Sequence, residues 1–171
     1  YLYGEVSYNR ADFYDLFGPT KTSRKGTSFE VGLRRSLIYD LPRTLDVEAY
    51  AAYHMNLDAL PAFQNVPVTY DELFGTGAEL NFSDTRRSIG AVDDESGYLW
   101  SVFGHLYNTL GDWYPGLFGQ FDFGRQLPIE HSSLWLRSSA GLSWGDRDSP
   151  LANAYFGAFG NNYVDDGEVK R

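Results

Sequence analysis

The chain has 171 residues, no cysteine and a formal net charge of −9 at pH 7. The absence of cysteine excludes a disulfide scaffold and a thiolate metal site. The acidic balance argues against a nucleic-acid partner, because phosphate binding requires clustered Lys and Arg. No segment approaches the run of roughly 18 apolar residues that a transmembrane helix needs.

The first three predicted elements are strands in which apolar and polar residues alternate. They are expected at residues 1–9, 28–38 and 44–56. The third shows the pattern best, since Leu45, Val47 and Ala49 fall on one side of an extended chain while Asp46 and Glu48 fall on the other. At roughly 3.3 Å per residue this strand spans about 40 Å. A transmembrane strand needs only about 9–11 residues, so the third strand is long enough to cross a bilayer.

Four further strands are expected, separated by connections that include residues 109–116 and 127–132. The strands are predicted at residues 74–83, 97–108, 117–125 and 133–144. Their polar residues continue the polar side of the third strand, since successive side chains point to opposite faces. We expect one group of side chains to share a polar, water-facing side: Asp46, Glu48, His54, Glu79, Asp122 and Arg137.

The pattern predicts an all-β, antiparallel transmembrane β-barrel, with seven or eight strands present in this chain. The apolar sides include Ala49, Ala51 and Ala78, a mixture of sizes that lipid tolerates, and the charged residues lie deep within strands, where a water-filled lumen would hold them. Aromatic residues gather near strand ends, as at a membrane interface. The alternative is a soluble, secreted β-sandwich that binds glycans through its many aromatic residues.

A basic stretch lies in the long connection between the first two strands. It reads Thr-Lys-Thr-Ser-Arg-Lys-Gly over residues 20–26 and lacks the spacing of a phosphate-binding loop. Three cations beside Phe13 and Tyr14 suggest contact with phosphates of lipopolysaccharide at the outer surface; they are Lys21, Arg24 and Lys25.

No catalytic or metal-binding residue is predicted. The three histidines are His54, His105 and His131, and a metal or catalytic site would need at least two of them to converge with carboxylates. His131 is followed directly by two serines, but a hydrolase triad needs its members brought together from separate positions. The expectation is therefore a protein that is not an enzyme and holds no cofactor.

The segment Asp84-Thr85-Arg86-Arg87, followed by Gly97-Tyr98-Leu99, resembles the Asp-x-Arg…Gly-Tyr turn of the Omp85 or bacterial surface-antigen (D15) barrels. The resemblance rests on Asp84, Arg86 and Gly97 and places this turn on the periplasmic side. It implies a bacterial outer-membrane barrel of about sixteen strands, of which this chain is a part. It also implies insertion or translocation of proteins, with unfolded or secreted proteins as substrates and outer-membrane lipid and lipopolysaccharide as surroundings.

Residues 149–171 would then correspond to the family's long sixth loop, which folds inward as a lid. Here the matching residues are Phe159, Gly160 and Asn161, with Arg171 further on. The family's Val/Ile-Arg-Gly-Phe/Tyr motif is absent, so residues 1–171 are interpreted as a barrel fragment of a divergent branch. A passive porin, or a barrel whose outer loops bind at the cell surface, remains the alternative function.

Overall fold

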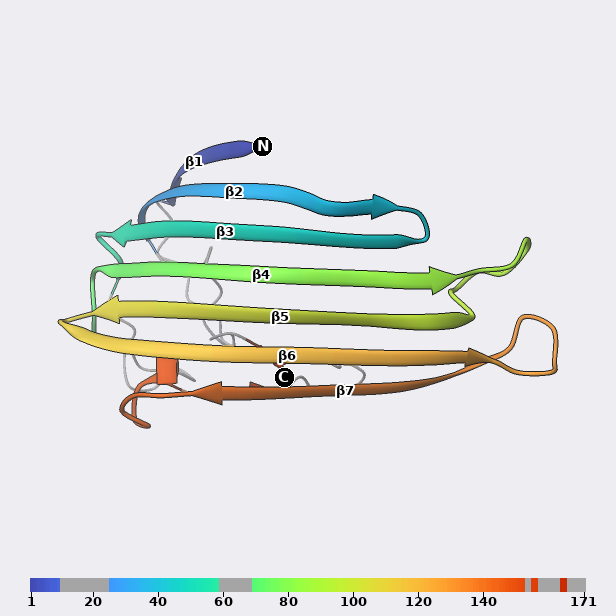
Figure 1. The fold of residues 1–171 in the computed structure, drawn as a ribbon. Coiled ribbons are helices and arrows are strands. Elements are labelled where there is room, and N and C mark those ends of the chain that lie inside the picture. Colours follow the sequence, from blue (N-terminus) through green and yellow to red (C-terminus); the bar gives the residue numbers. More distant parts are fainter. Residues whose placement is uncertain (10–24, 59–68, 153–154, 157–163, 166–171) are drawn as a thin grey trace.

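Seven strands form one antiparallel sheet in which every strand lies beside its neighbour in sequence (Figure 1). The structure, a computed structural model, describes residues 1–9, 25–58, 69–152, 155–156 and 164–165. The strands of the sheet are β1 (Leu2–Asn9), β2 (Gly26–Asp40), β3 (Arg43–Met55), β4 (Leu73–Arg86), β5 (Ser96–Thr109), β6 (Asp112–Gln126) and β7 (Ser133–Ser143). The 3₁₀ turn η1 (Pro150–Ala152) and a small pair, β8 (Tyr155–Phe156) with β9 (Val164–Asp165), follow.

The prediction of an all-β antiparallel fold is confirmed. The sheet is not closed into a barrel, because within the described residues β1 pairs with β2 alone and β7 with β6 alone. Both outer strands therefore present an open edge. Among the residues that the structure describes, no helix is long and apolar enough to cross a membrane.

The expected connection at residues 109–116 was wrong, since β6 already begins at Asp112. The turn consists of Leu110 and Gly111, whose φ angles are 53° and 89°, the combination found in tight two-residue hairpins. Pro115 is a poor signal for a strand because it has no N–H. It is accommodated here because the ladder uses its carbonyl, which accepts a hydrogen bond of 3.0 Å from the Trp144 amide.

The two ends of the sheet differ in their connections, and they are named here by one residue each. The Gly111 end, on the left in Figure 1, carries the tight turn between β5 and β6. The Ser88 end, on the right, carries the short β2–β3 turn and the loops 87–95 and 127–132. These two loops lie side by side because β5 and β6 hold their strands in register.

The register places most residues of one character on one face, with exceptions such as Arg35 opposite Val47 on the apolar side. Leu45, Phe82, Trp100 and Phe121 stand opposite one another across β3 to β6. One position further along β3, Asp46 lies in a row with polar residues of the same strands, namely Asn81, Ser101 and Gln120. Because side chains alternate along a strand, the sheet has one apolar face and one polar face, named so below.

Candidate functional site

The apolar face is the more exposed of the two. Leu136 is 66 % exposed and Leu142 60 %, whereas Phe118 on the polar face is 5 % exposed. A soluble sheet shows the reverse, since its apolar face packs on a core. The exposed side chains extend from β1 to β7 and include Leu2, Val6, Phe29, Val31, Leu33, Leu80, Val102, Leu117, Phe121, Phe123, Leu134, Leu136 and Leu142.

This exposed face forms a band with a measurable height. On β6 it runs from Trp113 to Phe123, and on β7 from Leu134 to Leu142, with Trp144 just beyond the strand. At about 3.3 Å per residue, the β6 part is about 33 Å long. For a strand tilted by about 40° this corresponds to a band about 25 Å high, the height of the apolar band of a membrane barrel.

The predicted polar, water-facing residues all lie on one face. The register places Asp46, Glu48 and His54 of β3 on the same side as Glu79 of β4, and Asp122 of β6 opposite Arg137 of β7 continues that side. Their common face is the polar face. Whether it surrounds a lumen depends on closure of the sheet, which belongs to the proposal below.

Charges on the polar face are arranged in pairs across strands. Arg34 donates two hydrogen bonds to the Glu48 carboxylate, one from Nε at 2.9 Å and one from Nη2 at 2.7 Å. The Tyr3 hydroxyl lies 3.0 Å from carboxylate oxygens of both Glu30 and Glu48. This network links β1, β2 and β3 through charge-assisted hydrogen bonds, as expected for charged side chains on one polar surface.

A second pair lies between β6 and β7 and involves Asp122. Its Oδ2 is 3.9 Å from Arg137 Nε and accepts a 3.1 Å hydrogen bond from Gln120. Asp122 is 7 % exposed, and its Oδ1 has no hydrogen-bond partner among the described residues.

Aromatic rings on the polar face lie directly over glycines of the neighbouring strand. Gly116 stands opposite His105, and Gly75 stands opposite Tyr107. A Cβ built on Gly116 would come within 2.5 Å of the His105 ring, and one on Gly75 within 2.9 Å of the Tyr107 ring. Sequence reasoning missed this feature, although the alternating glycines at 75 and 77 were a signal for it. The glycines let the rings lie flat against the sheet.

The polar face has a small apolar cluster at the Gly111 end. Tyr107 and Tyr114 pack there with Leu151 and Ala152, where the chain folds back after β7. The position of η1 beside β6 is visible in Figure 1. Residues 150–152, the start of the segment expected to act as a lid, therefore lie against the polar face.

The residues of the expected family turn flank the β4–β5 loop. Asp84 and Arg86 end β4, and Gly97 begins β5 opposite Thr85. The φ angle of Gly97 is 125°, and a Cβ at this position would overlap the carbonyl oxygen of Asp84. Only glycine fits this close approach. Asp84 also forms an ion pair of 3.6 Å with Arg43 on β3.

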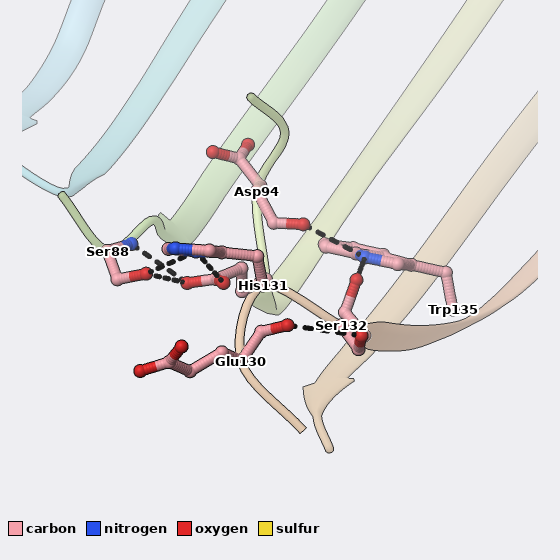
Figure 2. Close-up of polar contacts among 8 residues, drawn as sticks. Ser88, Asp94, Glu130, His131, Ser132 and Trp135 are labelled. Carbon is pink, nitrogen blue, oxygen red and sulfur yellow. Dashed lines mark hydrogen bonds and ion pairs between the residues drawn. The ribbon is translucent and has the colours of Figure 1, made fainter. Parts of the chain in front are cut away.

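A polar cluster joins the two loops of the Ser88 end (Figure 2). The buried carboxylate of Glu95 accepts hydrogen bonds from the Ser88 amide at 2.9 Å and from the Ser88 hydroxyl. His131 Nδ1 lies 3.3 Å from Glu95 and 3.4 Å from Ser88 Oγ. The hydrogen bonds from Ser88 hold the pKa of Glu95 below its usual range, while burial works in the opposite direction.

This cluster contains a serine, a histidine and a carboxylate but lacks the geometry of a hydrolase triad. A triad needs the hydroxyl at one ring nitrogen and the carboxylate at the other. Here both groups contact the same nitrogen, Nδ1 of His131. The arrangement instead clamps the loops together, and Trp135 adds a hydrogen bond of 3.1 Å from its indole to the Asp94 carbonyl.

Several predicted site residues fall outside the described part of the chain. They are Lys21 and Arg24 of the expected lipopolysaccharide loop, and Phe159, Gly160, Asn161 and Arg171 of the expected lid. Lys25 is described and directly precedes β2. Within the described ranges, no group of three or more His, Cys, Asp or Glu side chains is placed to hold a metal ion.

Comparison of the chain with protein-family models, with curated proteins and with solved structures finds no match. The resemblance carried by Asp84, Arg86 and Gly97 therefore supports a proposal of function and does not assign a family.

Proposed function

We propose that this chain forms part of the wall of a transmembrane β-barrel of the bacterial outer membrane, of the Omp85 or surface-antigen type. The main support for this proposal is the exposed apolar face, whose height matches the hydrocarbon layer of a membrane. Burying one large aliphatic side chain in lipid is worth about 1.5–3 kcal/mol. A continuous face of such side chains therefore favours lipid over water strongly.

The polar face is proposed to line a water-filled lumen. In the ion pair of Arg34 with Glu48, the arginine side chain is 51 % exposed and the glutamate side chain 24 %. This partial exposure is consistent with a surface in contact with water. A sheet curved toward this face crowds its side chains together and spreads those of the apolar face. Such a curvature accounts for the burial of Phe118, whereas Tyr107 is also covered by Leu151 and Ala152.

The proposed activity is insertion or translocation of proteins, with unfolded or secreted polypeptides as substrates. Two features support it: the likeness of residues 84–97 to the family turn, and the close approach of Gly97 to Asp84, which requires glycine at that position. A passive porin is the second candidate, favoured by a polar face that carries ion pairs. Neither activity involves a cofactor.

The lipid-facing assignment is tested with single-cysteine variants, because the chain has no cysteine of its own. Val102 and Ala140 lie on the apolar face, and Ser101 and Ser139 lie beside them on the polar face. Spin labels at Val102→Cys and Ala140→Cys should collide with oxygen dissolved in lipid. Labels at Ser101→Cys and Ser139→Cys should collide with a water-soluble nickel complex.

Equal accessibility of the four labels would overturn the membrane proposal. A monodisperse protein in buffer without detergent would favour the soluble glycan-binding alternative. The two membrane functions are separated by reconstitution in liposomes. An assembly protein should accelerate insertion of an unfolded barrel substrate, whereas a porin should give ion conductance without this acceleration.

A further inference from the structure

Toward the Ser88 end, the apolar face shows an ordered change of residue type. Along β4, every second residue gives Leu80, Phe82, Asp84 and Arg86. On β6, aromatic residues are likewise followed by Arg125 at the edge. The order aliphatic, aromatic, arginine follows the layers of a lipid leaflet, which are hydrocarbon, interface and phosphate.

The aromatic layer is well formed. The ring of Phe82 stacks on Tyr98 and on Trp100, with centroid separations of 5.4 and 5.5 Å. Phe121 and Phe123 continue this layer on β6, at 45 % and 47 % exposure. On this face, Tyr98 and Phe123 lie one position nearer the middle of the sheet than the arginines, and Phe82, Trp100 and Phe121 lie two positions nearer.

Arg86 and Arg125 occupy equivalent positions two strands apart. Arg86 pairs with Ser96, and Arg125 follows Gly124, the partner of Gly97. Strands are spaced by about 4.8 Å, so the backbones at these two positions are about 10 Å apart. Both side chains are exposed. Two guanidinium groups at this spacing can reach one headgroup or two adjacent ones.

Two of the neighbouring acidic groups, Asp84 and Glu95, are already engaged. Asp84 is paired with Arg43 at 3.6 Å, and Glu95 is held by Ser88 and His131. Neither Arg86 nor Arg125 forms an ion pair within the described part of the chain. Their charge is therefore available to an external anion.

The apolar face has a different residue composition at the Gly111 end than at the Ser88 end. The apolar-face residues there are Tyr53, Phe74 and Trp113, and no charged residue stands among them in the described strands. Along β4 to β6 the arginines thus mark one end of the apolar band and not the other, whereas on β2 Arg35 lies within the band opposite Val47.

We propose that Arg86 and Arg125 bind the headgroup phosphates of phospholipids in the leaflet at the Ser88 end, with the Phe82 ring stack in the interface below them. Arginine suits this role because its planar guanidinium can bind a phosphate through two hydrogen bonds. The inference rests on the proposed membrane location and adds a lipid preference and an orientation to it.

The test measures association of spin-labelled phosphatidylglycerol and phosphatidylcholine with the full chain in phosphatidylcholine vesicles. Each arginine near the headgroup should favour the anionic lipid about fivefold. The Arg86→Gln/Arg125→Gln variant should lose this preference, and the Arg86→Lys/Arg125→Lys variant should retain most of it. The control Arg137→Gln/Arg147→Gln removes the same charge from the polar face and from the segment after β7, and it should keep the wild-type preference.

Equal loss of preference in the test and control variants, or no loss in either, would overturn the inference. If these arginines prefer lipid A to phosphatidylglycerol, the proposal that they bind phospholipid headgroups is wrong. The alternating accessibility of labels at Ser101→Cys and Val102→Cys is measured in the same vesicles. If the alternation persists while the lipid preference is absent, the inference fails and the membrane proposal stands; loss of the alternation removes both.

Discussion

At the scale of single residues, several positions combine an unremarkable residue type with a strict spatial requirement. Gly116 is an example, since its hydrogen leaves room for the His105 ring on the neighbouring strand. Gly119 lies on the same strand but on the apolar face, where the nearest atom to an added Cβ is 3.8 Å away. The two glycines provide a matched comparison.

Gly116→Ala should destabilise the protein by about 1–3 kcal/mol, because the added methyl group must displace the His105 ring. Gly119→Ala should be neutral or slightly stabilising, since it lowers the conformational freedom of the unfolded chain. Urea unfolding followed by tryptophan fluorescence, in the lipid or detergent in which the protein folds, measures both. Similar effects of the two substitutions would contradict the packing argument.

The second residue-scale prediction concerns pH. Because the pKa of Glu95 is lower in the folded protein, its ionised form stabilises the fold above the unfolded pKa, and this contribution disappears as the pH falls through the folded pKa. Glu95→Gln should therefore unfold more easily than wild type near pH 7, and the difference should shrink once the pH falls below the ordinary pKa of a Glu carboxyl and vanish below the folded pKa. Urea titrations at several pH values measure the difference.

Glu130→Gln serves as the control, because this residue is exposed on the neighbouring loop and Ser132 bonds its backbone carbonyl instead of its carboxylate. A constant stability difference between Glu95→Gln and wild type across the pH range would show that the carboxylate charge is not involved.

At the scale of elements, the β5–β6 turn contains an unfavourable residue. Leu110 has φ of 53° and is 73 % exposed, although asparagine is preferred at this place before glycine. Leu110→Asn should raise the free energy of unfolding by about 1 kcal/mol. Leucine is strained at a positive φ angle, whereas asparagine adopts this conformation more readily because its short polar side chain can hydrogen-bond locally. Leu110→Val should lower the free energy of unfolding. The urea midpoints of the two variants and of the wild type give their order of stability. An unchanged midpoint in both variants would show that the turn is not strained.

A second element-scale prediction concerns β3 in the membrane. Ala49 lies on the apolar face in register with Ala78 and Leu33. Ala49→Arg should cost about 2–4 kcal/mol if this position is near the bilayer midplane. Ser101→Arg, on the polar face, should cost much less. Folding equilibria in lipid vesicles measure both substitutions, and equal costs would argue against lipid on the apolar side.

At the scale of the whole molecule, the open edges of β1 and β7 matter most. In lipid every backbone N–H and C=O must be paired, so a sheet with two free edges is not stable there. In lipid, the 171-residue chain should therefore pair its edges with further strands, from copies of itself or from another chain. Native mass spectrometry in detergent measures its state. A monodisperse monomer with heat-modifiable gel mobility would contradict this prediction.

At the scale of the whole molecule, register also decides which charges have a partner. On the polar face Glu48 pairs with Arg34 and Asp122 with Arg137, whereas Arg86 and Arg125 stand at the rim of the apolar face without an ion pair among the described residues. Neither composition nor net charge contains this arrangement, since it arises from register. It gives the sheet an orientation that a uniform apolar band would not have.

The sequence by itself determined the strands and the character of their faces. The alternation of Leu45, Val47 and Ala49 with Asp46 and Glu48 is local, because side-chain direction in a strand depends only on position along it. For that reason six of the seven predicted strands were placed within a few residues of their bounds, and only the start of β6 was missed, where Pro115 obscured the signal.

Only the tertiary structure decided which residues meet and which face is exposed. The contact of His105 with Gly116, the clamp of Ser88, Glu95 and His131, and the row of Arg86 and Arg125 all depend on pairing between strands. Pairing register is a non-local property, set by turn geometry and packing of the whole sheet. The sequence therefore supplied two faces, and the fold showed that the apolar one is open to its surroundings.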